Sequence, residues 1–313
     1  MANAVTTEGL TKDFRAGFWR ARPHRALDRL TIEIPVGGVF GLLGPNGAGK
    51  STTLKILVNL LWPTAGRADV LGCPPGDVSA RRRLGFLPEH PTFYDHLTAE
   101  ELLMYFAGLF GHAPADRRKR ASRLLDLVGI GADRRRLIRS YSKGMVQRVG
   151  VAQALVNDPE LVILDEPMSG LDPVGRRDVR ELILSLRDEG RTILFSSHIL
   201  SDAELLCSRV GILAKGRLVA SGSLSDLTAA RSESSGEGWE VVATGLDAPA
   251  ADRLTARARR ATCIAPGRYS FALPPEARPE PLVAEIAEAG GAVVSVQPLR
   301  TSLEDVFMER ISQ

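Results

Sequence analysis

Short runs of apolar residues recur through the first two-thirds of the chain, and each has the length of a buried β-strand. The clearest run, Leu161–Asp165, is apolar up to its final carboxylate, as expected of a strand covered on both faces. Segments with helical spacing of apolar residues separate these runs, so the pattern predicts an α/β domain with a largely parallel sheet. The basic, aromatic segment Thr11–Ala26 is expected to form an exposed loop between two strands. The strand candidates are Val39–Leu43, Leu161–Asp165, Thr192–Ser196 and Val210–Leu213.

A helical insertion is expected inside this domain. Residues 98–101, Thr-Ala-Glu-Glu, have the pattern of a capping box, in which the Thr98 and Glu101 side chains each bond to the other's backbone N–H. Apolar residues at helical spacing follow, with breaks at Gly111–Pro114 and Gly129–Gly131. The pattern predicts a helical subdomain at about residues 98–140, inside a domain that spans residues 1–230.

A change of composition marks the end of this domain. Ser232–Gly238 contains Ser, Gly and Glu and no apolar residue, which is typical of a flexible linker, so a linker is expected at residues 231–238. The segments beyond it predict a small α+β accessory domain at residues 239–313. Its expected elements are strands at Trp239–Ala243, Arg268–Leu273 and Ala292–Val296, and helices at Arg253–Arg260, Pro281–Ala289 and Ser302–Ile311.

Composition and charge narrow the class of protein. The chain has 313 residues, of which 44% are hydrophobic and 25% charged, as in ordinary folded domains. A net charge of +3 does not demand nucleic acid or an anionic membrane as a partner. Basic runs at Arg81–Arg83, Arg117–Arg120 and Arg134–Arg136 lack the aromatic residues that favour single-stranded nucleic acids. No run of about 18 apolar residues predicts a membrane-spanning helix, and no secretory signal is expected.

The cysteines favour a reducing compartment. Cys73, Cys207 and Cys263 lie far apart and form no CxxC pair. An odd, scattered set argues against both a disulfide framework and a zinc site, and fits a cytosolic protein.

The strongest candidate for chemistry is a glycine-rich segment between a strand and a helix. Residues 44–51, Gly-Pro-Asn-Gly-Ala-Gly-Lys-Ser, match the pattern GxxxxGK[ST]. The glycines let backbone N–H groups surround an anion, and the helix N-terminus adds partial positive charge. Lys50 would reach the β- and γ-phosphates of a nucleotide, and the Ser51 hydroxyl would ligate Mg²⁺. The candidate nucleotide-binding residues are Gly44, Pro45, Asn46, Gly47, Ala48, Gly49, Lys50, Ser51 and Thr52.

Two consecutive carboxylates end the apolar strand Leu161–Asp165. Asp165 would be costly at the end of a buried strand unless it faced a cation, and Mg²⁺ would be that cation. Glu166 follows at the strand tip, where a carboxylate can accept a proton from an attacking water. Such a pair is usually structural when it stands alone, but beside a phosphate-binding loop it indicates nucleotide hydrolysis.

The remaining motifs follow in order along the chain, and the whole set resembles the ABC ATPase family from about Val5 to Leu227. The sequence departs from that family at two places. Glu89 stands at the position of the Gln in the Q-loop, and Lys143 and Met145 replace Gly and Gln of the signature LSGGQ. The segments that carry the resemblance are Gly85–Glu89, Tyr141–Met145, Ser169–Asp172 and Thr192–His198.

This resemblance implies roles around one nucleotide. Phe14 would stack on adenine, with Phe18 and Trp19 as alternatives. Glu89 would ligate metal or hold water. The catalytic residues would be Glu166, which activates water, His198, which holds the γ-phosphate, and Lys50.

It also implies that residues of one subunit act on the nucleotide of another. Ser142, Lys143 and Gly144 of the signature would bind the γ-phosphate held by the opposite subunit. Asp172 of the D-loop would belong to the same shared site.

The family implies an ATP- and Mg²⁺-dependent ATPase that dimerises with a second ATP-binding subunit and drives a separate integral membrane permease. A homodimer is expected, with a heterodimer as the alternative. Such a subunit sits peripherally on the cytoplasmic side of the cell membrane. The C-terminal segment ending in Leu303–Phe307 resembles the accessory domain of daunorubicin-resistance exporters, so export is expected. The alternative is a soluble ABC ATPase that acts on nucleic acid or the ribosome. Because neither a coiled coil, a zinc insertion nor a second motor is visible, a nucleic-acid partner is not expected.

Overall fold

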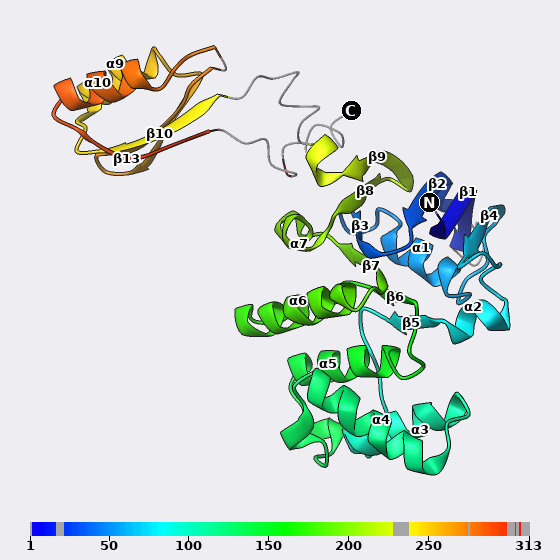
Figure 1. Ribbon diagram of the computed structural model, residues 1–313. Coiled ribbons are helices and arrows are strands. Elements are labelled where there is room, and N and C mark those ends of the chain that lie inside the picture. Colours follow the sequence, from blue (N-terminus) through cyan, green and yellow to red (C-terminus); the bar gives the residue numbers. More distant parts are fainter. Residues whose placement is uncertain are drawn as a thin grey trace. The chain divides into compact units, whose positions relative to one another are not determined.

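The computed structural model describes residues 2–16, 22–227, 238–274, 276–298, 304 and 307 (Figure 1). Backbone contacts divide the chain into two compact units, Met1–Ser223 and Leu224–Gln313. The linker expected at residues 231–238 lies outside the described residues except for Gly238, so the exact domain boundary stays a prediction.

A sheet of six strands forms the centre of the first unit among the described residues, in the order β5-β6-β7-β3-β8-β9. The first five strands run parallel, and only β9 is antiparallel to its neighbour. Strands β6 and β7 are buried along their whole length, which explains why β6 is entirely apolar and why residues 193–195 of β7 are apolar. The predicted α/β fold is therefore confirmed. The strands are β3 Gly38–Leu43, β5 Leu84–Leu87, β6 Leu161–Leu164, β7 Thr192–Ser197, β8 Arg209–Ala214 and β9 Arg217–Ser223.

Helices connect these parallel strands. The helix that follows β3 begins at Lys50, within the glycine-rich loop, and the helix that follows β6 begins after Asp172. The connecting helices are α1 Lys50–Leu57, α2 Val78–Arg82, α6 Pro173–Asp188 and α7 Leu200–Leu206.

A long antiparallel hairpin packs beside the main sheet and belongs to a second sheet of order β2-β1-β4. Its strands are β1 Asn3–Ala16, β2 Arg22–Pro35 and β4 Ala65–Val70. The loop expected at Thr11–Ala26 is therefore wrong, because both strands continue well into this segment. Asp13 and Arg25 face each other across the hairpin and form a two-point ion pair, which holds these polar stretches in the strand conformation. Residues 17–21, with Phe18 and Trp19, lie outside the described residues.

The helical subdomain occupies the lower part of the first unit in Figure 1 and confirms the predicted insertion. Glu101 N–H donates to Thr98 Oγ1 at 3.2 Å, and Thr98 N–H donates to Glu101 Oε2 at 2.9 Å, so the capping box is present. Gly111 has a φ of 83°, which suits the break between the first two helices. The helices are α3 Ala99–Leu109, α4 Pro114–Leu127 and α5 Lys143–Ala154, with short 3₁₀ turns at Gly131–Asp133 and Ile138–Ser140.

The second unit has a βαββαβ order, and its antiparallel sheet has the strand order β11-β12-β10-β13. This is the ferredoxin-like split βαβ arrangement. The helix expected at Arg253–Arg260 is misplaced, since Asp247 caps a helix that starts earlier and a strand begins at Arg260. The expected helix Ser302–Ile311 lies almost wholly outside the described residues. The elements are β10 Trp239–Thr244, α9 Ala248–Thr255, β11 Arg260–Ala265, β12 Arg268–Ala272, α10 Glu280–Glu288 and β13 Ala292–Pro298.

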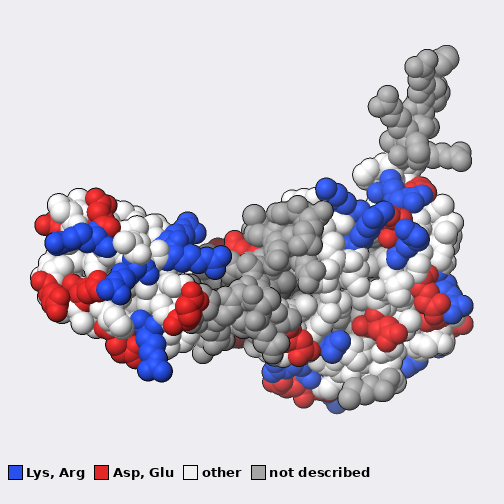
Figure 2. All heavy atoms as spheres, turned by 90° about the horizontal axis from the view of Figure 1, so that it is seen from above, with Lys and Arg blue, Asp and Glu red and all other residues white. Residues whose placement is uncertain are grey.

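The surface carries charges of both signs. On the face shown in Figure 2, basic and acidic side chains of the described residues are interspersed over both units. In the described part of the chain, none of the helices combines the length and the hydropathy needed to cross a bilayer.

Truncation after Ala230 should leave the first unit folded, because each unit has a cluster of buried residues of its own among the described residues. One cluster gathers residues between Ala4 and Leu218, and the other gathers residues between Trp239 and Val293. We expect the truncated chain to unfold in a single cooperative thermal transition and to bind ATP with unchanged affinity. Calorimetry and a nucleotide-binding titration test this. An aggregated product, or one that has lost ATP binding, would show that the second unit is needed by the first.

Candidate nucleotide-binding site

The glycine-rich loop joins the end of β3 to the start of α1, and its glycines are required by close packing. Gly44 and Gly49 have φ values of 155° and 105°, which side chains rarely adopt. A Cβ atom on Gly44 would lie 2.4 Å from the carbonyl oxygen of Leu213, and one on Gly49 would lie 2.7 Å from that of Ala26. The loop can therefore curl only with glycine at these two positions.

Lys50 bends back over this loop and is almost completely buried, with 5% of its surface exposed. Its Nζ donates to the carbonyl oxygen of Gly44 at 2.7 Å and to that of Pro45 at 3.3 Å. It also lies 3.2 Å from Oε1 of Glu166. A buried ammonium group needs such partners, and all of them lie where the loop's N–H groups would hold phosphate.

Asp165, which follows β6, is held by two hydroxyl groups, one from the first turn of α1 and one from β7. Ser51 Oγ donates to Asp165 Oδ1 at 3.0 Å, and Ser196 Oγ donates to the same oxygen at 2.7 Å. Burial raises the pKa of Asp165 above its ordinary value, and the nearby carboxylates of Glu89 and Glu166 add to this rise. An ionised Asp165 would therefore be stabilised by a cation at this point.

Glu166 follows in a left-handed backbone conformation with a φ of 48°, which turns its side chain toward the loop. Its N–H donates to Ser196 Oγ at 2.8 Å, and its Oε2 lies 2.8 Å from Nδ1 of His198. The other oxygen, Oε1, faces Lys50 and has no hydrogen-bond partner among the described residues. One carboxylate oxygen is thus oriented by histidine, while the other is left to accept a proton.

A hollow of about 350 Å³ opens over these groups. Phe14 of β1 forms one wall, and it stands opposite His24 in the hairpin. The Lys12 ammonium lies 5.2 Å from the centre of the Phe14 ring. His24 and Ala26 also line the hollow, and neither was singled out from the sequence. The lining residues are Phe14, His24, Ala26, Pro45, Asn46, Gly47, Ala48, Gly49, Lys50, Ser51, Thr52, Glu89 and Glu166.

The other predicted site residues lie elsewhere in this chain. Ser142 caps α5 by accepting a hydrogen bond from the N–H of Met145 at 3.3 Å. Lys143 lies against Gly170, where a Cβ atom would come 2.1 Å from its Nζ. Asp172 caps α6 by accepting from the N–H of Gly175 at 3.1 Å. Of the described residues, Ser142, Lys143, Gly144 and Asp172 are not among those that line the hollow.

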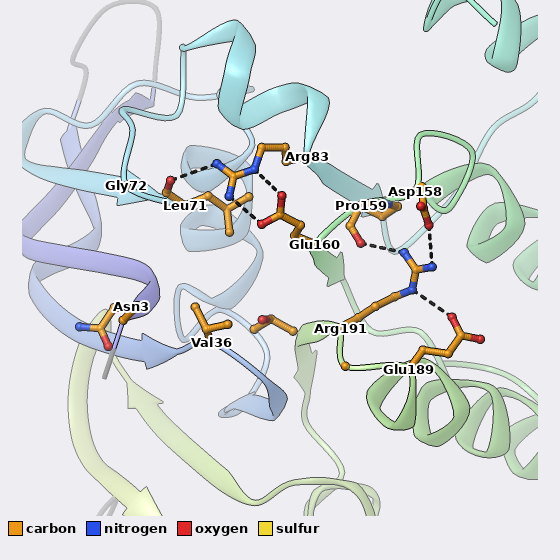
Figure 3. Close-up of a pocket in the computed structure, with 13 residues that line it drawn as sticks. Asn3, Val36, Leu71, Gly72, Arg83, Asp158, Pro159, Glu160, Glu189 and Arg191 are labelled. Carbon is orange, nitrogen blue, oxygen red and sulfur yellow. Dashed lines mark hydrogen bonds and ion pairs between the residues drawn. The ribbon is translucent and has the colours of Figure 1, made fainter.

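A second hollow, of about 510 Å³, lies at the amino ends of the parallel strands (Figure 3). Arg83 binds both oxygens of Glu160 at 2.6 Å. Arg191 binds Asp158 at 2.7 Å and Glu189 at 3.2 Å. Because both guanidinium groups are already neutralised, this hollow has no cation left for a phosphate. Ligands of such sheets bind at the carboxyl ends of the strands, where the glycine-rich loop lies.

Comparison with known proteins agrees with this assignment. Residues 27–169 match the family model described as ABC transporter. An uncharacterized ABC transporter ATP-binding protein of Synechocystis sp. is 43% identical over 314 residues, which cover all of this chain and 86% of that protein. The daunorubicin/doxorubicin resistance ATP-binding protein DrrA of Streptomyces peucetius is 38% identical over 229 residues, covering 72% of this chain and 66% of that protein.

Solved structures give the same result. The ATP-binding subunit of an ABC transporter matches with a TM-score of 0.63 and 32% identity, over 73% of this chain and 93% of that one. A dimeric ATP-binding cassette in a post-hydrolysis state, bound to ADP and Pi, matches with a TM-score of 0.65 and 26% identity, over 70% of this chain and 98% of that one. The chain therefore belongs to the family of ABC transporter ATP-binding proteins, and it is an ATPase.

Proposed function

We propose that this protein hydrolyses ATP at sites shared by two copies of the chain and thereby drives export through a separate membrane permease. The observation that carries the proposal is the cluster of Lys50, Glu166 and His198 over the glycine-rich loop. These groups supply a cation for phosphate, a general base and an orienting imidazole.

ATP would occupy the hollow with its phosphates in the glycine-rich loop and its base near Phe14. Phosphate oxygens then replace the carbonyl oxygens of Gly44 and Pro45 as partners of Lys50. Lys50 leaves Oε1 of Glu166 at the same time, and this oxygen accepts a proton from the attacking water. His198 keeps the other carboxylate oxygen in place and reaches toward the γ-phosphate.

The residues around Asp165 fit Mg²⁺. Asp165 and Ser51 already meet through oxygen atoms, and Glu89 adds a third oxygen donor close enough to raise the pKa of Asp165. Oxygen donors of this kind are what Mg²⁺ prefers. Asp165, Ser51 and Glu89 would hold the ion, which would supply positive charge to neutralise the phosphates.

A second copy of the chain completes each site. Ser142, Lys143 and Gly144 stand at the start of α5, where N–H groups and the helix dipole favour an anion. They are not part of the hollow of their own chain, so they are available to the γ-phosphate held by a partner. The dimeric state of the solved cassette supports this arrangement.

The names of the relatives support export. Besides the daunorubicin-resistance protein, a fluoroquinolones export ATP-binding protein of Mycobacterium tuberculosis is 42% identical over 226 residues, covering 69% of this chain and 74% of that one. Membership of the ABC transporter family supports a place beside a membrane permease, on the cytoplasmic side. A cassette that acts on nucleic acid or the ribosome is not favoured.

An aromatic patch near the Glu89 loop is suited to the permease. Tyr94, Tyr105, Leu109 and Phe110 are all at least 42% exposed. Tyr94 and Tyr105 meet edge to face at 6.1 Å between ring centres, which joins the segment after Glu89 to α3. A cytoplasmic segment of the permease seated here would sense movement of the nucleotide site through that short segment.

Replacing Glu166 by Gln keeps its shape and removes the base. We expect turnover to fall by at least about 100-fold, while ATP still binds and an ATP-bound dimer accumulates. Phosphate release and size-exclusion chromatography with light scattering measure the two effects. Lys50→Ala is the matched variant, since it should lose nucleotide affinity and form no dimer. Normal turnover in Glu166→Gln would remove Glu166 from the mechanism.

Phe14→Ala should weaken ATP binding by about 1 kcal/mol if the ring stacks on adenine. Titration with a fluorescent ATP analogue measures this affinity. The affinity for GTP should fall by a similar amount, because stacking needs only a planar base. If the affinity for both nucleotides is unchanged, another aromatic residue stacks on the base.

Leu109→Ser combined with Tyr105→Ala should release the protein from membranes of its source cells and leave ATP hydrolysis in solution within about twofold, because neither residue lines the hollow of the nucleotide site. Co-sedimentation with these membranes is the measurement. Trp62→Ala, at a side chain that is 75% exposed, is the matched control and should sediment like the wild type. Equal sedimentation of all three proteins would exclude this patch.

A further inference from the structure

Two segments pack against the backbone of the glycine-rich loop. They are the part of β2 around Ala26–Asp28 and the turn between β8 and β9. Gly216 N–H, in that turn, donates to the carbonyl oxygen of Ala48 at 3.0 Å, and Asp28 N–H donates to that of Gly216 at 2.9 Å. A Cβ atom on Gly216 would lie 2.8 Å from the carbonyl oxygen of Ala26, so this turn requires glycine.

A line of charges reinforces the same junction. The Asp28 side chain is only 7% exposed, and its Oδ2 accepts from Arg217 Nε at 2.6 Å and lies 2.5 Å from Nη2. Its Oδ1 accepts from Arg25 Nη1 at 3.2 Å. Arg25 in turn binds both oxygens of Asp13, at 2.9 and 3.2 Å. The hydrogen bond to Arg217 lowers the pKa of Asp28, so this carboxyl group is ionised at neutral pH.

One end of this line adjoins a wall of the hollow, because Asp13 immediately precedes Phe14. The other end, Arg217, follows Gly216, whose N–H donates to the carbonyl oxygen of Ala48 in the lining of the hollow. Arg217 is the first residue of β9, the last strand of the first unit. The junction therefore joins the aromatic wall, the glycine-rich loop and the final strand of the ATPase unit.

We propose, on the basis of the nucleotide site proposed above, that Asp28, Gly216 and Arg217 form a clamp that holds the glycine-rich loop at the correct distance from the Phe14 wall. Asp28 and Arg217 are then positioning residues for ATP affinity. Neither has a contact with Glu166 or His198 among the described residues, so the clamp acts on binding and not on the chemical step.

Loss of Arg217 leaves the buried Asp28 carboxylate with Arg25 as its remaining close partner, which is unfavourable. The turn then keeps only its two backbone hydrogen bonds, to Ala48 and from Asp28, and moves more freely against Ala48. ATP must restrict this motion when it binds, and the free energy of that ordering is subtracted from its affinity.

Arg217→Gln in the full-length chain tests the clamp. We expect KM for ATP to rise by at least about fivefold while kcat stays within about twofold. Arg217→Lys restores a charge without the two-point geometry and should give an intermediate KM. The double variant Asp28→Asn/Arg217→Gln should raise KM no further than the more severe single variant, because both remove one interaction.

Two matched variants separate positioning from general stability. Arg29 also lies near Asp28, at 3.8 Å, but it is 79% exposed, so Arg29→Gln should leave KM unchanged. Arg83→Gln breaks the two-point pair with Glu160 at the opposite edge of the sheet (Figure 3). It should lower Tm as Arg217→Gln does but leave KM unchanged. If Arg217→Gln lowers Tm and leaves KM unchanged, the clamp is only structural and the proposal is overturned.

Hydrogen exchange on the wild type gives a test that does not depend on folding of a variant. ATP should slow exchange at the amides of Asp28 and Gly216 as well as in residues 44–52, whereas protection confined to residues 44–52 would overturn the proposal. Lys50→Ala distinguishes an error in the proposed nucleotide site from an error in the proposed clamp. If that variant binds ATP like the wild type, the site is wrong; if it loses ATP and Arg217→Gln keeps a normal KM, only the clamp is wrong.

Discussion

Burial of charge at the carboxyl edge of the parallel sheet is the constraint on which the rest of the first unit depends. Lys50, Asp165 and Glu166 are 5%, 1% and 7% exposed. Charges as buried as these are strongly unfavourable unless each has partners. The partners come from the start of α1, from the residues after β6 and from the end of β7. Three chain segments must therefore meet at one place. The order β6-β7-β3 within the sheet achieves this, because it makes these strands direct neighbours.

The same constraint explains how binding and chemistry are connected. Without phosphate, Lys50 Nζ and Glu166 Oε1 form an ion pair, at 3.2 Å. In the proposed mechanism a phosphate group would compete for Lys50 and so free Oε1 of Glu166, the proposed general base. This oxygen would then become available when the substrate is in place, and His198 would keep the carboxylate oriented through the exchange. Farther out, the packing of Ala26, Ala48 and Gly216 fixes the loop from behind, where no catalytic group is involved.

Local patterns in the sequence predicted the parts of the molecule that depend on local chemistry. The capping box at Thr98, the buried strand before Asp165 and the glycine-rich loop are each specified within a few residues. The sequence did not indicate His24 and Ser196, because hairpin register and strand order bring them to the site over long sequence separations. The start of α9 was missed for a different reason. Asp247 is a regular N-cap, but the apolar spacing that follows it is too short to identify a helix.

The capping hydrogen bonds of Ser142 and Asp172 indicate different roles for these two residues toward a second chain. A hydroxyl group can accept and donate at once, so Ser142 Oγ can receive the N–H of Met145 and still donate its hydrogen to a phosphate. Asp172 is a carboxylate that only accepts, and it already receives the N–H of Gly175. Its charge would repel a phosphate, whereas its second oxygen can accept from a partner's N–H group. Ser142 and Lys143 are therefore suited to the nucleotide itself, and Asp172 is suited to the protein surface beside it.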